Sequence, residues 1–131
     1  MVVDTSVLIA ILLDEPDREA FENAIDEADV CLVSAMSKFE AGMVMIGRLG
    51  NACAIRLDQL LDSIGAIIVP FDDHQATIAR SAFARYGKGR HKAALNFGDC
   101  AAYALAVAEA EPLLFKGTDF GATDVEVVAL Q

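Results

Sequence analysis

The fold is decided at the start of the chain, by the stretch Met1-Val2-Val3-Asp4-Thr5-Ser6-Val7-Leu8-Ile9-Ala10-Ile11-Leu12-Leu13. Residues 1–3 form a short apolar run without helical spacing, which predicts a buried strand. Asp4, Thr5 and Ser6 are helix-capping residues, and the apolar run 7–13 behind them predicts a helix. A strand that passes directly into a helix is the first unit of an α/β fold.

The same alternation continues through the remaining residues. Further strands are predicted over 30–33, 66–69, 112–115 and 125–130. Helices are predicted from Pro16 to Ala28, over 35–49, over 54–64, from a cap at Asp72 or Asp73 to Tyr86, and over 98–108. Strands that alternate with helices predict one three-layer α/β/α domain over residues 1–131, with a central, mainly parallel sheet and helices on both faces.

The composition indicates the cellular location of such a domain. The chain has 131 residues and no tract near the roughly 18 apolar residues that would span a bilayer, so no membrane association is expected. Its start has no basic region and is not a secretory signal. Its three cysteines are odd in number and lack CxxC spacing, which is typical of reduced core residues. We therefore expect a cytoplasmic protein.

The charge of the chain is strongly segregated. The net charge of −10 alone argues against a nucleic-acid partner. Residues 74–98, however, contain no acid and hold five of the ten Lys and Arg residues. The candidates for contact with phosphate groups are Arg85, Lys88, Arg90 and Lys92. A solvated surface loop is the alternative interpretation for each of them taken singly.

Four acidic side chains are expected near the carboxyl ends of the strands, where open α/β sheets bind ligands. Asp4 follows the first strand, Asp119 follows the fourth, Asp99 opens the helix before the fourth, and Glu40 lies on an apolar face of the helix after the second. Each also has an ordinary explanation. Asp4 can cap a helix, Asp99 can complement a helix dipole, and Asp119 can stabilise a turn. Glu40 can face a solvated gap between helices.

If the four carboxylates converge, their repulsion requires a counter-charge. At about 4 Å and an effective dielectric near 20, one carboxylate pair costs about 4 kcal/mol. Oxygen ligands without His or Cys at zinc-like spacing favour Mg²⁺ or Mn²⁺. Such an ion can activate a water and hold a phosphate group for in-line attack, as phosphodiester hydrolysis requires. The pattern therefore indicates a metal-dependent nuclease.

The sequence resembles the PIN-domain family, and VapC toxins in particular. The four acidic motifs that carry the resemblance are Val3-Asp4-Thr5-Ser6, the lone Glu40, Gly98-Asp99-Cys100 and Thr118-Asp119-Phe120. The stretches that are similar to VapC toxins are Tyr86-Gly87-Lys88-Gly89-Arg90-His91, Leu95-Asn96-Phe97-Gly98-Asp99 and Leu113-Leu114-Phe115-Lys116-Gly117. Chain length and βα alternation agree over essentially the whole sequence.

The resemblance implies a Mg²⁺- or Mn²⁺-dependent endoribonuclease that acts on RNA such as transfer RNA. It also implies a homodimer that is held inactive by a VapB-type antitoxin. Carried over, Asp4 and Asp99 would be the principal metal ligands, Asp119 would complete the set, and Glu40 would bind metal or orient the attacking water. Many PIN domains carry a further Asp or Asn two positions before the Asp-Phe pair, where this chain has Gly117. Asp124 is a candidate substitute.

Two other classes of protein remain as alternatives. A phospho-acceptor signalling domain of the receiver type shares the size and the α/β order, but it usually pairs acids near the first strand and ends its third strand in Asp. Here the first strand is followed by a single acid, and Pro70-Phe71 separate the third strand from Asp72. The other alternative is a catalytically inactive PIN fold that serves as a binding module.

Overall fold

The computed structural model describes residues 1–131, and its strands form one sheet with the order β3-β2-β1-β4. The strands are β1 (Val2–Val3), β2 (Leu32–Ser34), β3 (Ile67–Val69) and β4 (Leu113–Leu114). All three strand pairs are parallel. The prediction of a parallel α/β sheet is confirmed.

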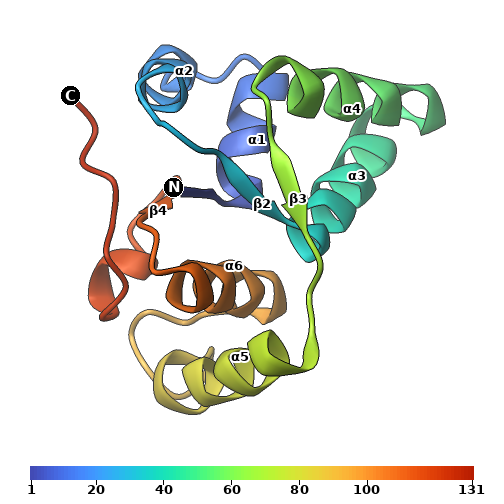
Figure 1. The fold of residues 1–131 in the computed structure, drawn as a ribbon. Coiled ribbons are helices and arrows are strands. Elements are labelled where there is room, and N and C mark those ends of the chain that lie inside the picture. The colour runs from blue at the N-terminus through green and yellow to red at the C-terminus, as the bar shows by residue number, and fades with distance from the viewer.

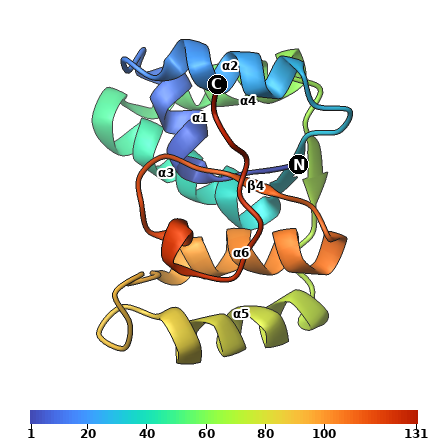
Figure 2. The ribbon, with the colours of Figure 1, turned by 90° about the vertical axis from the view of Figure 1, so that its left-hand side faces the viewer.

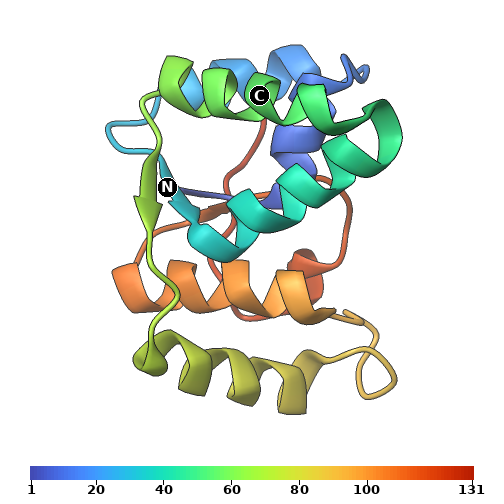
Figure 3. The ribbon, with the colours of Figure 1, turned by 90° about the vertical axis from the view of Figure 1, so that its right-hand side faces the viewer.

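Six α-helices cover this sheet in two layers. They are α1 (Thr5–Leu12), α2 (Arg18–Asp26), α3 (Ala35–Leu49), α4 (Ala54–Ser63), α5 (Asp73–Tyr86) and α6 (Phe97–Glu109). Figure 1 shows α1 to α4 on one side of the sheet and α5 with α6 on the other, and Figure 3 shows α5 and α6 lying side by side. None of these helices combines the length and apolar character needed to cross a bilayer.

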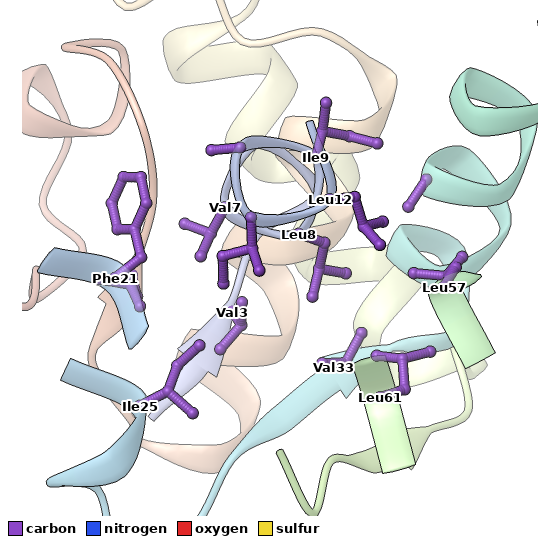
Figure 4. Packing of buried hydrophobic residues seen from close by; sticks show 14 of the residues in the cluster. Val3, Val7, Leu8, Ile9, Leu12, Phe21, Ile25, Val33, Leu57 and Leu61 are labelled. Atoms are coloured by element: carbon purple, nitrogen blue, oxygen red, sulfur yellow. The ribbon is translucent and has the colours of Figure 1, made fainter. Parts of the chain in front are cut away.

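The two layers enclose separate apolar clusters because successive side chains of a strand point to opposite faces. Val3, Val33 and Leu114 belong to the cluster under α1 to α4, part of which is drawn in Figure 4. Their neighbours Val2, Leu32 and Leu113 belong to the cluster under α5 and α6. Strands β1, β2 and β4, of only two or three residues each, are thus buried on both faces, whereas β3 at the edge of the sheet is partly exposed.

The prediction of a last strand over residues 125–130 is wrong. The segment makes one isolated parallel bridge, between Leu113 and Val127, with hydrogen bonds from Leu113 N to Glu126 O (2.9 Å) and from Val128 N to Leu113 O (3.0 Å). Figure 2 shows it crossing beside β4 as irregular chain. Most of its side chains are exposed, so no buried face sets a longer register.

The helices α1 and α6 begin earlier than the apolar pattern predicts, at Thr5 and Phe97. Asp4 caps α1 and Asn96 caps α6, each through its side-chain oxygen. Strand β1 lies between β2 and β4, and the chain after β1 turns into α1, so the strand order changes direction at this point. The carboxyl ends of β1 and β4 therefore frame the place where a ligand is expected.

Candidate functional site

Asp4 lies at the carboxyl end of β1 and is buried, with 4% of its surface exposed. Its Oδ2 accepts hydrogen bonds from Ser6 N (3.0 Å) and Ser6 Oγ (2.6 Å). The Ser6 hydroxyl in turn accepts a bond from Lys116 N, just beyond β4, at 2.9 Å. Asp4 Oδ1 is buried and has no hydrogen-bond partner. One carboxylate oxygen thus serves as a helix cap, and the other is left without a partner.

Asp99 lies in the first turn of α6 and forms a reciprocal capping box with Asn96. Asp99 Oδ2 accepts a bond from Asn96 N (3.0 Å), and Asn96 Oδ1 accepts one from Asp99 N (2.9 Å). The pKa of Asp99 is raised to about 6, chiefly by burial and also by the charges of Asp4, Asp119 and Glu40, while the hydrogen bond from Asn96 N acts in the opposite direction. All three other predicted acids are therefore close enough to repel Asp99.

Glu40 reaches the same place from α3. A Cβ built on Gly98 would overlap the Glu40 carboxylate, so this carboxylate lies directly against the backbone of α6 beside Asp99. Burial raises the pKa of Asp4, and the charge of Glu40 adds to that effect. Glu40 thus faces Asp4 and Asp99 rather than a solvated gap on its own.

Asp119 lies at the start of a 3₁₀ turn, η2 (Phe120–Ala122), and its side chain is exposed. The next residue, Phe120, is buried and packs edge-on against Phe115, with the ring centroids 5.1 Å apart. Gly117, the position at which the resemblance to PIN domains leads us to expect a further ligand, has a φ of +103°. This conformation strains any residue with a side chain, so the glycine serves the turn.

The structure brings Asp4, Glu40, Asp99 and Asp119 to one edge of the sheet. No three His, Cys, Asp or Glu side chains stand close enough together to hold a metal ion as they are placed. The residues nevertheless fit a divalent cation, because the set is made only of carboxylates, its members repel one another, and Asp4 Oδ1 lacks a partner. Oxygen donors of this kind suit a hard ion such as Mg²⁺ or Mn²⁺.

The four basic residues have two different surroundings. Arg85, in the last turn of α5, pairs with Asp124 (Nη2 to Oδ2, 3.3 Å) and lies over the ring of Tyr86. Lys88, Arg90 and Lys92 are exposed and make no ion pair. They belong to the loop between α5 and α6, which extends past the ends of both helices (Figure 3). This loop ends at the cap of α6, next to Asp99.

Several residues of the site were not singled out from the sequence as part of it. Ser6 holds Asp4 and the chain after β4 together, and Asn96 holds Asp99. The signals were present: Ser6 lies two residues after Asp4, and Asn96 lies three before Asp99, which is the spacing of a capping box. Asp124, the candidate substitute ligand, instead accepts bonds from Tyr103 and Arg85.

Comparisons with known proteins show the family of the chain. The PIN domain family model matches residues 1–126. VapC ribonuclease Mb0640 of Mycobacterium bovis is 46% identical over 130 residues, 99% of each chain. Ribonuclease VapC of Mycolicibacterium smegmatis is 48% identical over 128 residues, 98% of this chain and 99% of the relative.

Solved structures show the same fold. Mycobacterium tuberculosis VapC20, described as a Sarcin-Ricin loop cleaving toxin, superposes with a TM-score of 0.79 at 16% identity and covers 97% of each chain. A DNA-bound VapBC from Salmonella typhimurium superposes with a TM-score of 0.70 at 16% identity, over 97% of this chain and 95% of the other.

The acids gather at the switch point of a parallel sheet, which is where open α/β sheets bind ligands. The chain belongs to the PIN-domain family, and to the VapC ribonucleases within it. The receiver-like alternative is thereby excluded. Its candidate acceptor Asp72 caps α5 instead, with Oδ1 accepting a bond from Gln75 N at 2.9 Å.

Proposed function

We propose that this protein is a divalent-metal-dependent endoribonuclease and the toxin of a toxin–antitoxin pair. The observation that carries the proposal is the mutual repulsion of Asp99, Asp4, Glu40 and Asp119 around the unpartnered Oδ1 of Asp4. Carboxylates with raised pKa values that gather at one place are typical of functional sites, and a bound cation would neutralise their repulsion. The names of the relatives supply the substrate class, RNA.

Asp4 and Asp99 would hold Mg²⁺ or Mn²⁺, and Asp119 would complete the set. When bound, the ion would lower the pKa of a water and offset the charge on the scissile phosphate. Glu40 lies against the start of α6 and would orient that water or accept its proton. Ser6 and Asn96 would keep the two principal ligands in place through the bonds they make to the carboxylates.

The loop between α5 and α6 would hold the RNA backbone. An acidic cluster repels phosphate groups, so cations beside it are needed to bind the flanking nucleotides. Lys88, Arg90 and Lys92 are free of ion pairs and precede Asp99 in the chain, and Arg85 would join them. Replacing the three loop cations by Ala should weaken RNA binding at low salt. It should also reduce the slope of log affinity against log salt by about 2–3.

A protein partner is the second part of the proposal. A solved relative is a VapBC complex, which supports a VapB-type antitoxin as the inhibitor of this chain. An apolar groove of about 340 Å³ lies between α3 and α4, and Phe39 (62% exposed) and Met43 (60%) line it. Exposed apolar surface of this kind is typical of a protein interface, and a homodimer would cover some of it as well.

The test is RNA cleavage by the purified chain. The wild-type protein should cut RNA with Mn²⁺ or Mg²⁺, lose activity in EDTA and regain it when Mn²⁺ is restored. Asp4→Asn and Asp99→Asn should stay folded and lose at least about 100-fold in activity, since each removes a proposed ligand. Asp62→Asn, on the exposed side of α4, is the matched control and should cleave normally. Full activity in the two site variants would refute the metal site. A folded wild-type chain that binds Mn²⁺ and never cuts RNA would indicate a binding module instead.

A further inference from the structure

A hydrogen-bonded cluster lies beside the acidic site and ties three parts of the chain together. Tyr103 Oη, on α6, donates to Asp124 Oδ1 at 2.6 Å. Arg85, on α5, donates to Asp124 Oδ2 (3.3 Å) and to Tyr86 Oη (2.7 Å). The ring centroids of Tyr86 and Tyr103 are 6.0 Å apart. Both oxygens of the Asp124 carboxylate are therefore occupied by side chains of the α5–α6 layer.

The cluster connects two residues of the site. Tyr103 lies one helical turn after Asp99 on α6, and Asp124 follows the turn that begins at Asp119. The bond between Tyr103 and Asp124 thus fastens the far end of residues 117–123, which we call the Asp119 segment, to the helix that carries Asp99. The near end is fastened by Phe120, which is buried against Phe115.

The Asp119 segment itself has few other side-chain constraints, and residues 116–119 are exposed. The chain before it is held by the bond from Lys116 N to Ser6 Oγ, and the chain after it by the two backbone bonds of Leu113 with Glu126 and Val128. Thr123 Oγ1 donates to Phe120 O at 2.7 Å, so η2 is closed on itself rather than on the rest of the molecule. Within residues 117–125, Asp124 makes the only side-chain hydrogen bonds to another element, so its loss would leave the segment held by the packing of Phe120, Ala122 and Val125.

We propose that Asp124 is a positioning residue that holds the Asp119 segment against α6 through Tyr103 and Arg85, and thereby sets where Asp119 meets Asp99. The proposal rests on the proposed metal-dependent function. The proposal separates Asp124 from the ligand set.

Electrostatics agree with this role. The hydrogen bond from Tyr103 lowers the pKa of Asp124, with the charge of Arg85 acting in the same direction, so the carboxylate stays ionised as an acceptor. Burial, together with the bond to Asp124, raises the pKa of Tyr103, so its hydroxyl stays a donor. Asp124 is not among the charges that raise the pKa of Asp99, whereas Asp119 is.

The test compares Tyr103→Phe and Asp124→Asn with two controls remote from the site. Ser63→Ala removes a hydroxyl that makes a 2.8 Å bond at the end of α4, and Asp62→Asn neutralises an exposed carboxylate. Tyr103→Phe keeps the ring and its packing, so this variant retains the fold. Hydrogen–deuterium exchange over residues 117–123 is measured in EDTA. The affinity for Mn²⁺ is measured by titration calorimetry without RNA, and RNA cleavage is measured as separate kcat and KM values.

Both site variants should accelerate exchange over 117–123 and leave α1 to α4 unchanged. Both should weaken Mn²⁺ binding and lower kcat by about tenfold, the loss typical of a group that orients a metal ligand, with KM little changed. The double variant should lose less than the sum of the two single losses, because Asp124→Asn weakens the same bond that Tyr103→Phe removes. The controls should match the wild type in every measurement.

Three results would overturn the inference. Unchanged exchange over 117–123 in Tyr103→Phe would show that the bond does not hold the segment. Normal Mn²⁺ affinity in Tyr103→Phe with complete loss in Asp124→Asn would make Asp124 a ligand itself. Absence of Mn²⁺ binding and cleavage in the wild type would remove the proposed function and the positioning role with it. The exchange data would distinguish that case, since they are recorded without metal.

Discussion

Replacement of Asp99 by Asn should stabilise the metal-free protein at neutral pH while abolishing its activity. The carboxyl ionises near its ordinary value of 3.8 in the unfolded chain and near 6 in the folded protein. Between these values the folded state binds the proton more tightly. The free energy of unfolding therefore falls as the pH rises from about 4 to 6, and it stays lower above 6.

The size of the effect follows from the pKa shift. A shift of about two units corresponds to about 3 kcal/mol for a fully buried group. Asp99 is only partly buried, so solvent screening reduces the expected gain to about 1–2 kcal/mol. Asn retains an oxygen that can accept the bond from Asn96 N, so the cap of α6 is preserved. For a chain of this length we expect the melting temperature to rise by about 4–6 °C.

The measurement is thermal and urea unfolding of Asp99→Asn and wild type in EDTA, at pH 7.5 and near pH 4. The variant should be more stable at pH 7.5, and the difference should shrink near pH 4, where both folded forms are neutral at this position. Mg²⁺ should stabilise the wild type more than the variant, since only the wild type has the full set of charges. Asp62→Asn should follow the wild type at both pH values. A variant no more stable than the wild type at pH 7.5, or a gain that is the same at both pH values, would refute the electrostatic reasoning.

Two further substitutions test the geometry of the site. Gly98→Ala places a methyl group where the Glu40 carboxylate lies, so initial rates of RNA cleavage should fall about tenfold or more. The melting temperature should stay level or rise, because Ala favours a helix and the flexible carboxylate can move away. Unchanged rates would mean that the position of Glu40 does not matter. Ser6→Ala removes the hydroxyl that donates to Asp4 Oδ2 and accepts from Lys116 N. The free energy of unfolding in urea should fall by about 1–3 kcal/mol, and RNA cleavage should become slower as well. An unfolding curve identical to that of the wild type would contradict the role of Ser6 as a link between β1 and β4.

The helices and their order could be predicted from the sequence because helix formation is governed by neighbours three and four positions apart. The helix over 35–49 has the bounds that its apolar pattern and Gly50 predict. The cap at Asp72 was among the predicted alternatives as well. Asp4, Asp99 and Asp119 could be named in the same way, since each follows a strand or opens a helix, where a side chain reaches the carboxyl edge of a parallel sheet. Glu40 could be named because it lies on an apolar face of its helix, where a lone carboxylate is unusual.

Tertiary structure alone decided the features that depend on pairing between distant segments. Residues 125–130 have the β-branched composition of a strand, but the two-residue β4 offers them a single bridge. The contact of Glu40 with Gly98 and the bond between Tyr103 and Asp124 join residues 58 and 21 positions apart, and no local periodicity encodes them. Local hydrogen bonds and helix caps are determined by residues that are close in the sequence. Contacts between side chains from distant segments depend on how whole helices and strands pack.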